Sequence, residues 1–307
     1  MDATTKTRLA RYARYARHAG YPAFFLLAFV AMLYLTLPYQ VIAEQLAAAG
    51  RSAGFKVVVG SIGPGLARIR AKGVRITPPK QEGQTAEPEA LVIEELSFRP
   101  TLFPMGTAFA ARLFGGTAEG SVGMGSKPFV TLKLKTIDLA RINAKAVFGL
   151  DVGGKLNLAV NVASSEPVSL GPRGLEYDAS KLSGSVGLAG DTLAINGGTV
   201  ANYDLPKVDL GRLDAVVRIE PGKVDIATFR TEGGDAESSL EGQIALQKML
   251  AVSTLRLKLK FKPSDDFLKR NSFIQTGLSF AMTRDPKGYY AANIERTIGN
   301  PRFAPVR

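Results

Sequence analysis

Runs in which apolar and polar residues alternate are the feature that most narrows the folds open to this chain. The clearest run is Val252–Lys262 (VSTLRLKLKFK), and Phe129–Leu139 and Lys155–Val162 alternate in the same way. Successive side chains of a β-strand point to opposite faces of its sheet. The first run therefore predicts one apolar sheet face, to which it contributes Leu255, Leu257, Leu259 and Phe261. The pattern is typical of antiparallel sheets with one apolar and one wet face.

Glycine pairs between these runs predict hairpin turns, because glycine adopts the positive φ that tight turns need. The pairs are Gly115-Gly116, Gly153-Gly154, Gly197-Gly198 and Gly233-Gly234. Further strands are expected at Lys56–Val59, at Leu66–Ile76 and as a pair between Gly288 and Phe303, and the proline-bearing stretch 77–90 reads as a polar loop. The fold expected is mainly β, a glycine-rich and mostly antiparallel sheet, either a curved open sheet or a closed sandwich.

Few helices are expected. Apolar residues at helical spacing predict a short helix over Tyr39–Ala49. A second helix is expected to begin after Ser264 as N-cap, with Asp265 and Asp266 in its first turn, and to continue through Leu278. Adjacent carboxylates in a helix point apart, so this acidic pair is interpreted as helix capping and not as a catalytic pair.

An uncharged apolar segment, Tyr21–Leu37 (YPAFFLLAFVAMLYLTL), predicts a single transmembrane helix over residues 19–38. It is longer than the apolar region of a signal peptide, and no good cleavage site follows it, so an uncleaved anchor is favoured. The side chains expected to contact lipid are Tyr21, Phe24, Phe25, Leu26, Leu27, Phe29, Val30, Leu33, Leu35 and Leu37.

Residues 1–18 form a basic tail, and positive flanks are retained in the cytoplasm. The topology determinants are Lys6, Arg8, Arg11, Arg14 and Arg17. This charge bias predicts an inner-membrane protein with a cytoplasmic N-terminus, and it places residues 39–307 in the periplasm. The tail holds +4 of the net charge of +12, and the remaining +8 is spread over 289 residues. A surplus of positive charge that is spread so thinly does not favour nucleic-acid binding.

The sequence contains few of the residue combinations that catalytic sites require. The chain has no cysteine and one histidine, His18, which excludes a Ser-His-Asp triad beyond that position and any Cys/His zinc site. The segment 149–155 (GLDVGGK) matches part of a phosphate-binding loop but lacks the following Ser or Thr and the following helix, so it is interpreted as a hairpin turn. We expect no catalytic residues, no metal ligands and no cofactor, and therefore no enzyme.

Three stretches carry a family resemblance: Leu35–Tyr39 (LTLPY), Gly65–Pro79 (GLARIRAKGVRITPP) and Thr297–Phe303 (TIGNPRF). Together with the basic tail and the anchor, they resemble the N component of the type II (general) secretion pathway of Gram-negative bacteria, in the form with an AsmA-like periplasmic region. The family usually has glycine before the threonine of the last stretch, where this chain has Arg296.

The resemblance implies a non-enzymatic inner-membrane component of the type II secretion system that contacts other secretion components in the periplasm. The broader AsmA-like group implies an alternative, a lipid-handling module for outer-membrane biogenesis. Such a module would bind acyl chains along the apolar sheet face.

Overall fold

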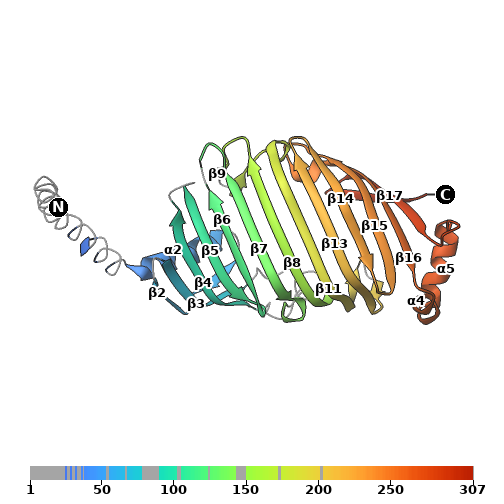
Figure 1. The fold of residues 1–307 in the computed structure, drawn as a ribbon, viewed down its shortest axis with the longest axis horizontal. Coiled ribbons are helices and arrows are strands. Elements are labelled where there is room, and N and C mark those ends of the chain that lie inside the picture. Colours follow the sequence, from blue (N-terminus) through green and yellow to red (C-terminus); the bar gives the residue numbers. More distant parts are fainter. Residues whose placement is uncertain are drawn as a thin grey trace, which may run out of the picture.

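The computed structural model describes residues 38–52, 55–65, 68–77, 90–101, 105–123, 125–142, 150–171, 174–200 and 203–306, together with Phe25, Ala28, Phe29, Met32 and Thr36. These residues build one large sheet in which every strand pair is antiparallel (Figure 1). The mainly β fold with few helices that the alternation predicted is confirmed. Within this described set, no helix has both the length and the apolar character needed to cross a bilayer.

Sixteen strands make up the large sheet. They are β1 Lys56–Val58, β2 Ser61–Gly65, β3 Arg68–Thr77, β4 Leu91–Thr101, β5 Gly106–Leu113, β6 Gly116–Gly123, β7 Phe129–Asp138, β8 Leu150–Ser164, β11 Leu182–Val200, β12 Tyr203–Leu205, β13 Val208–Glu220, β14 Lys223–Glu232, β15 Ala236–Ala245, β16 Thr254–Pro263, β17 Tyr290–Thr297 and β18 Asn300–Pro305. The strands follow one another across the sheet in chain order, with β2 and β12 as short additions beside β3 and β11. Strands β9 Ser169–Gly171 and β10 Gly174–Glu176 form a separate small sheet.

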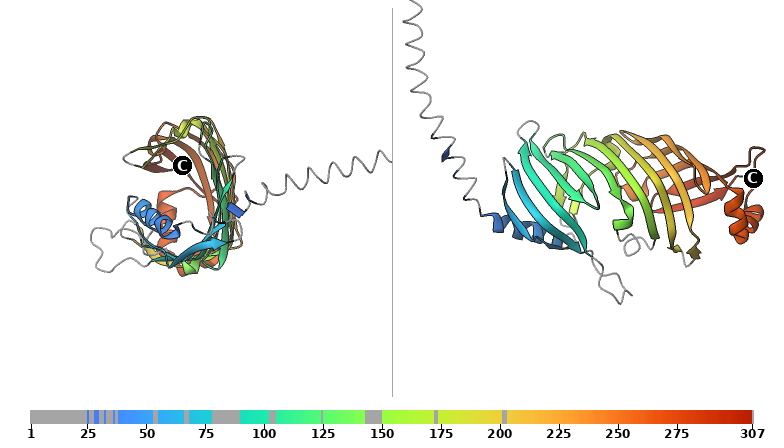
Figure 2. Two further views of the ribbon diagram at one scale, coloured as in Figure 1. Left: turned by 90° about the vertical axis from the view of Figure 1, so that its left-hand side faces the viewer. Right: turned by 60° about the horizontal axis from the view of Figure 1, so that its bottom comes forward.

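From residue 38 onward, the α-helices of the described residues lie at the two ends of the large sheet (Figures 1 and 2). They are α2 Tyr39–Ser52, α4 Asp265–Arg270 and α5 Ser272–Ala281. Short 3-10 turns lie between strands: η1 Leu139–Arg141, η2 Ala179–Lys181 and η3 Leu250–Val252. The first helix matches the prediction over Tyr39–Ala49. It packs against β1, because Gly50 leaves room for the Val57 side chain and the Phe55 N–H donates to the Gly50 carbonyl at 2.8 Å.

The sheet curls about its long axis into an open trough, which Figure 2 shows end-on as an incomplete ring. Its first and last strands, β1 and β18, do not pair with each other. Bulges contribute to the bend, since an extra residue in one strand kinks the ladder. Two of them carry a threonine at positive φ, Thr136 in β7 (φ 55°) and Thr192 in β11 (φ 52°). The two architectures left open by the sequence are thus resolved in favour of the curved, open sheet.

Two of the four predicted glycine hairpins are confirmed. Gly115 (φ 72°) turns β5 into β6, and Gly233 (φ 78°) turns β14 into β15. The other two predictions are wrong, because Gly153-Gly154 lies inside β8 and Gly197-Gly198 lies inside β11. These strands pair with each other along most of their length, and the register shifts beside Gly197. There the glycines absorb irregularities in a long ladder and do not reverse the chain. The predicted turn at 149–155 is likewise wrong, since Leu150 begins β8.

The C-terminal helix prediction holds at its start and fails in its middle. Ser264 is the N-cap, and its hydroxyl oxygen accepts from the Phe267 N–H at 3.2 Å. The helix is broken at Asn271 (φ −130°, ψ 60°), which divides it into α4 and α5. The expected final strand pair is present as β17 and β18. Arg296 has φ 73°, a left-handed conformation that favours glycine, the residue usual at this place in the family that the sequence resembles.

Two glycines of β11 give a matched test of the ladder. Gly184 has φ 144°, and a methyl group there would collide with the Asn161 carbonyl oxygen of β8, whereas a methyl at Gly187 would meet nothing within 4 Å. We expect Gly184→Ala to lower the free energy of unfolding by about 2 kcal/mol. Gly187→Ala should leave it unchanged or raise it by up to about 0.5 kcal/mol. Urea unfolding followed by far-ultraviolet circular dichroism measures both, and equal effects would contradict the register of β8 on β11.

Candidate functional site

An unbroken row of apolar residues crosses the large sheet from β2 to β18. Each member is the register partner of the next, so all of them lie on one face. The row, called here the apolar row, is Pro64, Ile69, Phe98, Phe109, Gly120, Leu132, Val160, Val186, Val217, Ile226, Gly242, Leu257, Ile294 and Phe303. Strands are about 4.8 Å apart, so the row runs on the order of 60 Å along the trough.

The apolar row lies on the concave face of the trough. Val57 belongs to this face, since it pairs with Ile76 of β3, and it contacts α2, which Figure 2 shows inside the curve. Small side chains of the same face are hidden by their neighbours, as a concave surface requires: Ala71 is 0% exposed and Ala292 is 1% exposed. A second row runs parallel to the first and is also entirely apolar, and its central members are Ala118, Leu134, Leu158, Leu188 and Ala215.

No second layer covers the middle of the concave face in the part of the chain that the structure describes. Contacts between elements run mainly between neighbouring strands, and the main contacts of α2 are with β1 and β2 (Figure 2). Most members of the apolar row are consequently only partly buried, and Phe303 at its end is 63% exposed. An apolar surface of this length left open to solvent is unusual for a monomeric protein and marks a binding surface.

The convex face has the opposite character. Register partners there alternate in charge, as in the series Lys72, Glu95, Arg112, and in the series Arg218, Asp225 on the other half of the sheet. Ion pairs link neighbouring strands, with Lys260 Nζ 3.2 Å from a Glu241 oxygen and an Arg112 nitrogen 3.8 Å from a Glu95 oxygen. These pairs are largely exposed, so each contributes little to stability, but together they keep the outer face wet.

The perturbed ionisable groups have structural causes. The Ser180 hydroxyl, 2.7 Å away, lowers the pKa of Asp178 by donating to its carboxylate, and the pair caps η2. The Tyr289 hydroxyl donates to Glu237 at 3.0 Å, and this bond raises the pKa of Tyr289. The Asp225 carboxylate raises the pKa of Lys223. None of these groups is in the apolar row.

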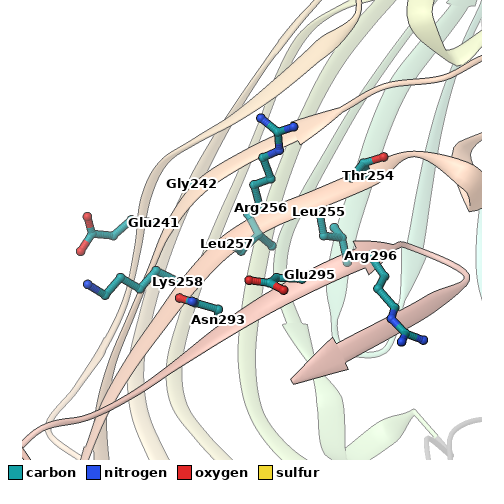
Figure 3. Close-up of a pocket in the computed structure, with 10 residues that line it drawn as sticks. All are labelled: Glu241, Gly242, Thr254, Leu255, Arg256, Leu257, Lys258, Asn293, Glu295 and Arg296. Carbon is teal, nitrogen blue, oxygen red and sulfur yellow. The ribbon is translucent and has the colours of Figure 1, made fainter. Parts of the chain in front are cut away.

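A hollow of about 640 Å³ lies over β15, β16 and β17 (Figure 3). Arg256 and Glu295 line it as register partners, and Lys258 pairs in the same way with Asn293. Figure 3 shows the Arg256 and Arg296 side chains directed away from each other. Across the described part of the chain, no group of three His, Cys, Asp or Glu side chains could hold a metal ion. The hollow therefore offers surface charges but no assembled catalytic or metal-binding set.

The structure places Leu255, Leu257, Leu259 and Phe261 together on the concave face of β16. Leu255 and Leu257 are 8% and 9% exposed, and the Phe261 ring stacks on Tyr290 of β17 with centroids 5.6 Å apart. Of the expected anchor residues, Phe25 and Phe29 are helical and mostly exposed, and the others lie outside the described residues. The topology determinants at positions 6–17 also lie outside them.

Many residues of the concave face were not predicted from the sequence. Phe98 and Phe109 stand in β4 and β5, where alanine, serine and proline obscure the alternation. The ring of Phe109 lies over Gly120 of β6, so a position without a side chain still belongs to the apolar row. The pairing of an aromatic residue with a glycine is the signal that reveals such strands, and it requires the register to be known.

Comparison with known proteins gave no family model, no curated protein and no solved structure that matches this chain.

Whether the concave face is open in solution can be tested by labelling, because the chain has no cysteine. Leu188→Cys places a thiol on the concave face and Ala189→Cys places one on the convex face of the same strand. We expect both thiols to react with a water-soluble maleimide without denaturant, within about an order of magnitude in rate. A thiol at position 188 that reacts only after unfolding would show a closed core instead of a trough.

Proposed function

We propose that this chain is a non-enzymatic, membrane-anchored module whose trough binds the acyl chains of lipids. The observation that carries the proposal is the apolar row, which is continuous over fourteen strands and uncovered in its middle. An acyl chain is a thin apolar rod. A trough lined by leucine, valine and phenylalanine removes most of the surface of such a chain from water. Burial of apolar area is worth about 25 cal/mol per Å², so even one chain in the trough would be held firmly.

The dimensions of the trough support a lipid in extended form. One bilayer leaflet contributes about half of the 30 Å hydrocarbon thickness, so an acyl chain spans about 15 Å. A trough on the order of 60 Å can therefore hold several lipids in sequence. The headgroups can remain in water, because the trough is open along one side (Figure 2). An open side distinguishes this arrangement from a closed cavity, which would have to bury or exclude the headgroup.

A second candidate follows from the sequence resemblance to the N component of the type II secretion pathway. In that case the chain acts in the periplasm, anchored in the inner membrane, through contacts with other secretion components. The edges of the sheet are poor docking sites, since β18 contains Pro301 and Pro305 and β1 has three residues. The trough is therefore the better surface for a partner, which would have to present an apolar segment.

One crosslinking experiment separates the two candidates. A photoreactive benzophenone amino acid is introduced in living cells at Leu158 or Leu188 on the concave face. Asn157 and Ala189, their neighbours on the convex face, serve as matched controls. Irradiation before solubilisation traps whatever occupies the trough in the native membrane. Mass spectrometry then identifies the adduct.

We expect lipid adducts at positions 158 and 188 and none at 157 and 189. A protein adduct at the concave positions would support the second candidate and contradict the first. Equal labelling of both faces, or no adduct on the concave face, would contradict both proposals.

A further inference from the structure

Helix α5 exposes two aromatic side chains that no neighbouring element covers. Phe273 is 66% exposed and Phe280 is 88% exposed. The two residues are seven positions apart, so they lie on one side of the helix, with Gly277 between them opening onto empty space. The opposite side of the helix carries Ile274 and Leu278, which are half-buried.

Two side-chain hydroxyls of α5 are satisfied within the helix itself. The Thr276 hydroxyl donates to the Ser272 carbonyl at 3.1 Å, and the Ser279 hydroxyl donates to the Thr276 carbonyl at 2.8 Å. Residues 271–283 contain no charged side chain. Hydroxyls that bond back to the helix backbone can enter an apolar environment without becoming unpaired donors.

The helix is displayed from a fixed base. Phe267 and Leu268 of α4 are 6% and 5% exposed, and they hold α4 against the end of the sheet. Asn271 joins the two helices, and its side-chain amide donates to the Phe267 carbonyl at 3.0 Å. Arg270, next to it, is paired with Asp235 at the start of β15. Helix α5 and its two exposed phenylalanines are therefore held in place by α4.

The C-terminal part of the chain, which includes α5, carries a net positive charge. Residues 254–307 contain 11 basic and 4 acidic side chains, a net charge of +7, whereas residues 39–253 contain 23 basic and 22 acidic side chains. The basic surplus of the chain beyond its N-terminal tail is thus concentrated at one end of the sheet and is not dilute. Lys269 and Arg270 precede α5 and are paired with Asp266 and Asp235, and Arg284 and Lys287 follow it with Asp285 between them.

We propose that α5 docks on an anionic membrane surface, inserting Phe273 and Phe280 between lipids while the basic residues around it contact the headgroups. Exposed aromatics on one side of a helix, set among lysine and arginine, are the features of helices that bind in the plane of a membrane interface. Helix α5 lies at the opposite end of the sheet from α2 (Figure 1). The docked surface is therefore a second membrane, facing the one that holds the proposed N-terminal anchor. This inference does not depend on what occupies the trough.

A single tryptophan reports the docking, because the chain contains none. The full-length Phe280→Trp protein is purified in detergent and transferred to nanodiscs of zwitterionic lipid. Vesicles containing about 30% phosphatidylglycerol are then added, with and without brominated acyl chains. We expect the indole emission of the Phe280→Trp protein to shift to shorter wavelength and to be quenched by bromine. The same experiment with Met105→Trp, at a turn where Met105 is 76% exposed, should show no change on addition of vesicles.

Flotation of the vesicles gives the second measurement. Phe273→Ser with Phe280→Ser should reduce the vesicle partition coefficient by roughly tenfold for each phenylalanine lost, whereas Met105→Ser should not change it. Binding should weaken with added salt and with purely zwitterionic vesicles. Unchanged far-ultraviolet circular dichroism verifies that the variants are folded.

Three outcomes would overturn the proposal. Indole emission of the Phe280→Trp protein that does not respond to vesicles of either composition excludes membrane docking. A blue shift before vesicles are added, which rises with protein concentration, identifies a second copy of the chain as the occupant. A blue shift in the nanodisc alone, independent of concentration, means that α5 binds the membrane in which the chain is held.

Discussion

The register of strand pairing is the constraint on which the rest of this structure depends. Side chains of a strand alternate between faces, so a slip of one residue in any pair would turn that strand's apolar side outward. Where two apolar residues of a strand are an odd number of positions apart, a β-bulge between them keeps both side chains on the same face. In β7, Leu134 and Ile137 both lie on the concave face although they are three positions apart, because the ladder shifts between them at Thr136. In β14, Ile226 and Phe229 are kept on one face in the same way.

A sheet without a second layer satisfies its backbone hydrogen bonds but cannot bury its own apolar side. The curl of the sheet removes part of this surface from water, which is why alanines such as Ala71 and Ala292 are hidden while larger neighbours remain half-exposed. The remaining exposure is a standing free-energy cost that a bound apolar molecule would relieve. The convex side does not carry this cost, since its charged side chains are hydrated and form ion pairs across strands. The asymmetry between the two faces is therefore the physical basis for assigning binding to one of them.

Alternation in the sequence was sufficient to predict strands and one apolar face. In β16 the reason is clear: between Leu255 and Phe261 no residue is a glycine, and every polar residue is charged. Glycine pairs did not predict hairpin turns reliably, because a glycine at positive φ occurs both in hairpins and in bulges, as Gly115 and Gly154 illustrate. Closure could not be predicted, since a sandwich core and an open trough produce the same alternation. The break at Asn271 was missed because asparagine is tolerated within helices. The apolar row depends on pairings between strands that no single run of residues encodes.

The chain-order arrangement of the strands has a consequence for how such a molecule changes over evolutionary time. Almost every strand depends only on the strand before it and the strand after it, as in a solenoid, where stability is a sum of local units and their interfaces. Inserting or deleting one hairpin would lengthen or shorten the trough by about 10 Å without disturbing pairings elsewhere. The distance that the trough spans is thus set by the number of hairpins, and it can change without redesign of a core.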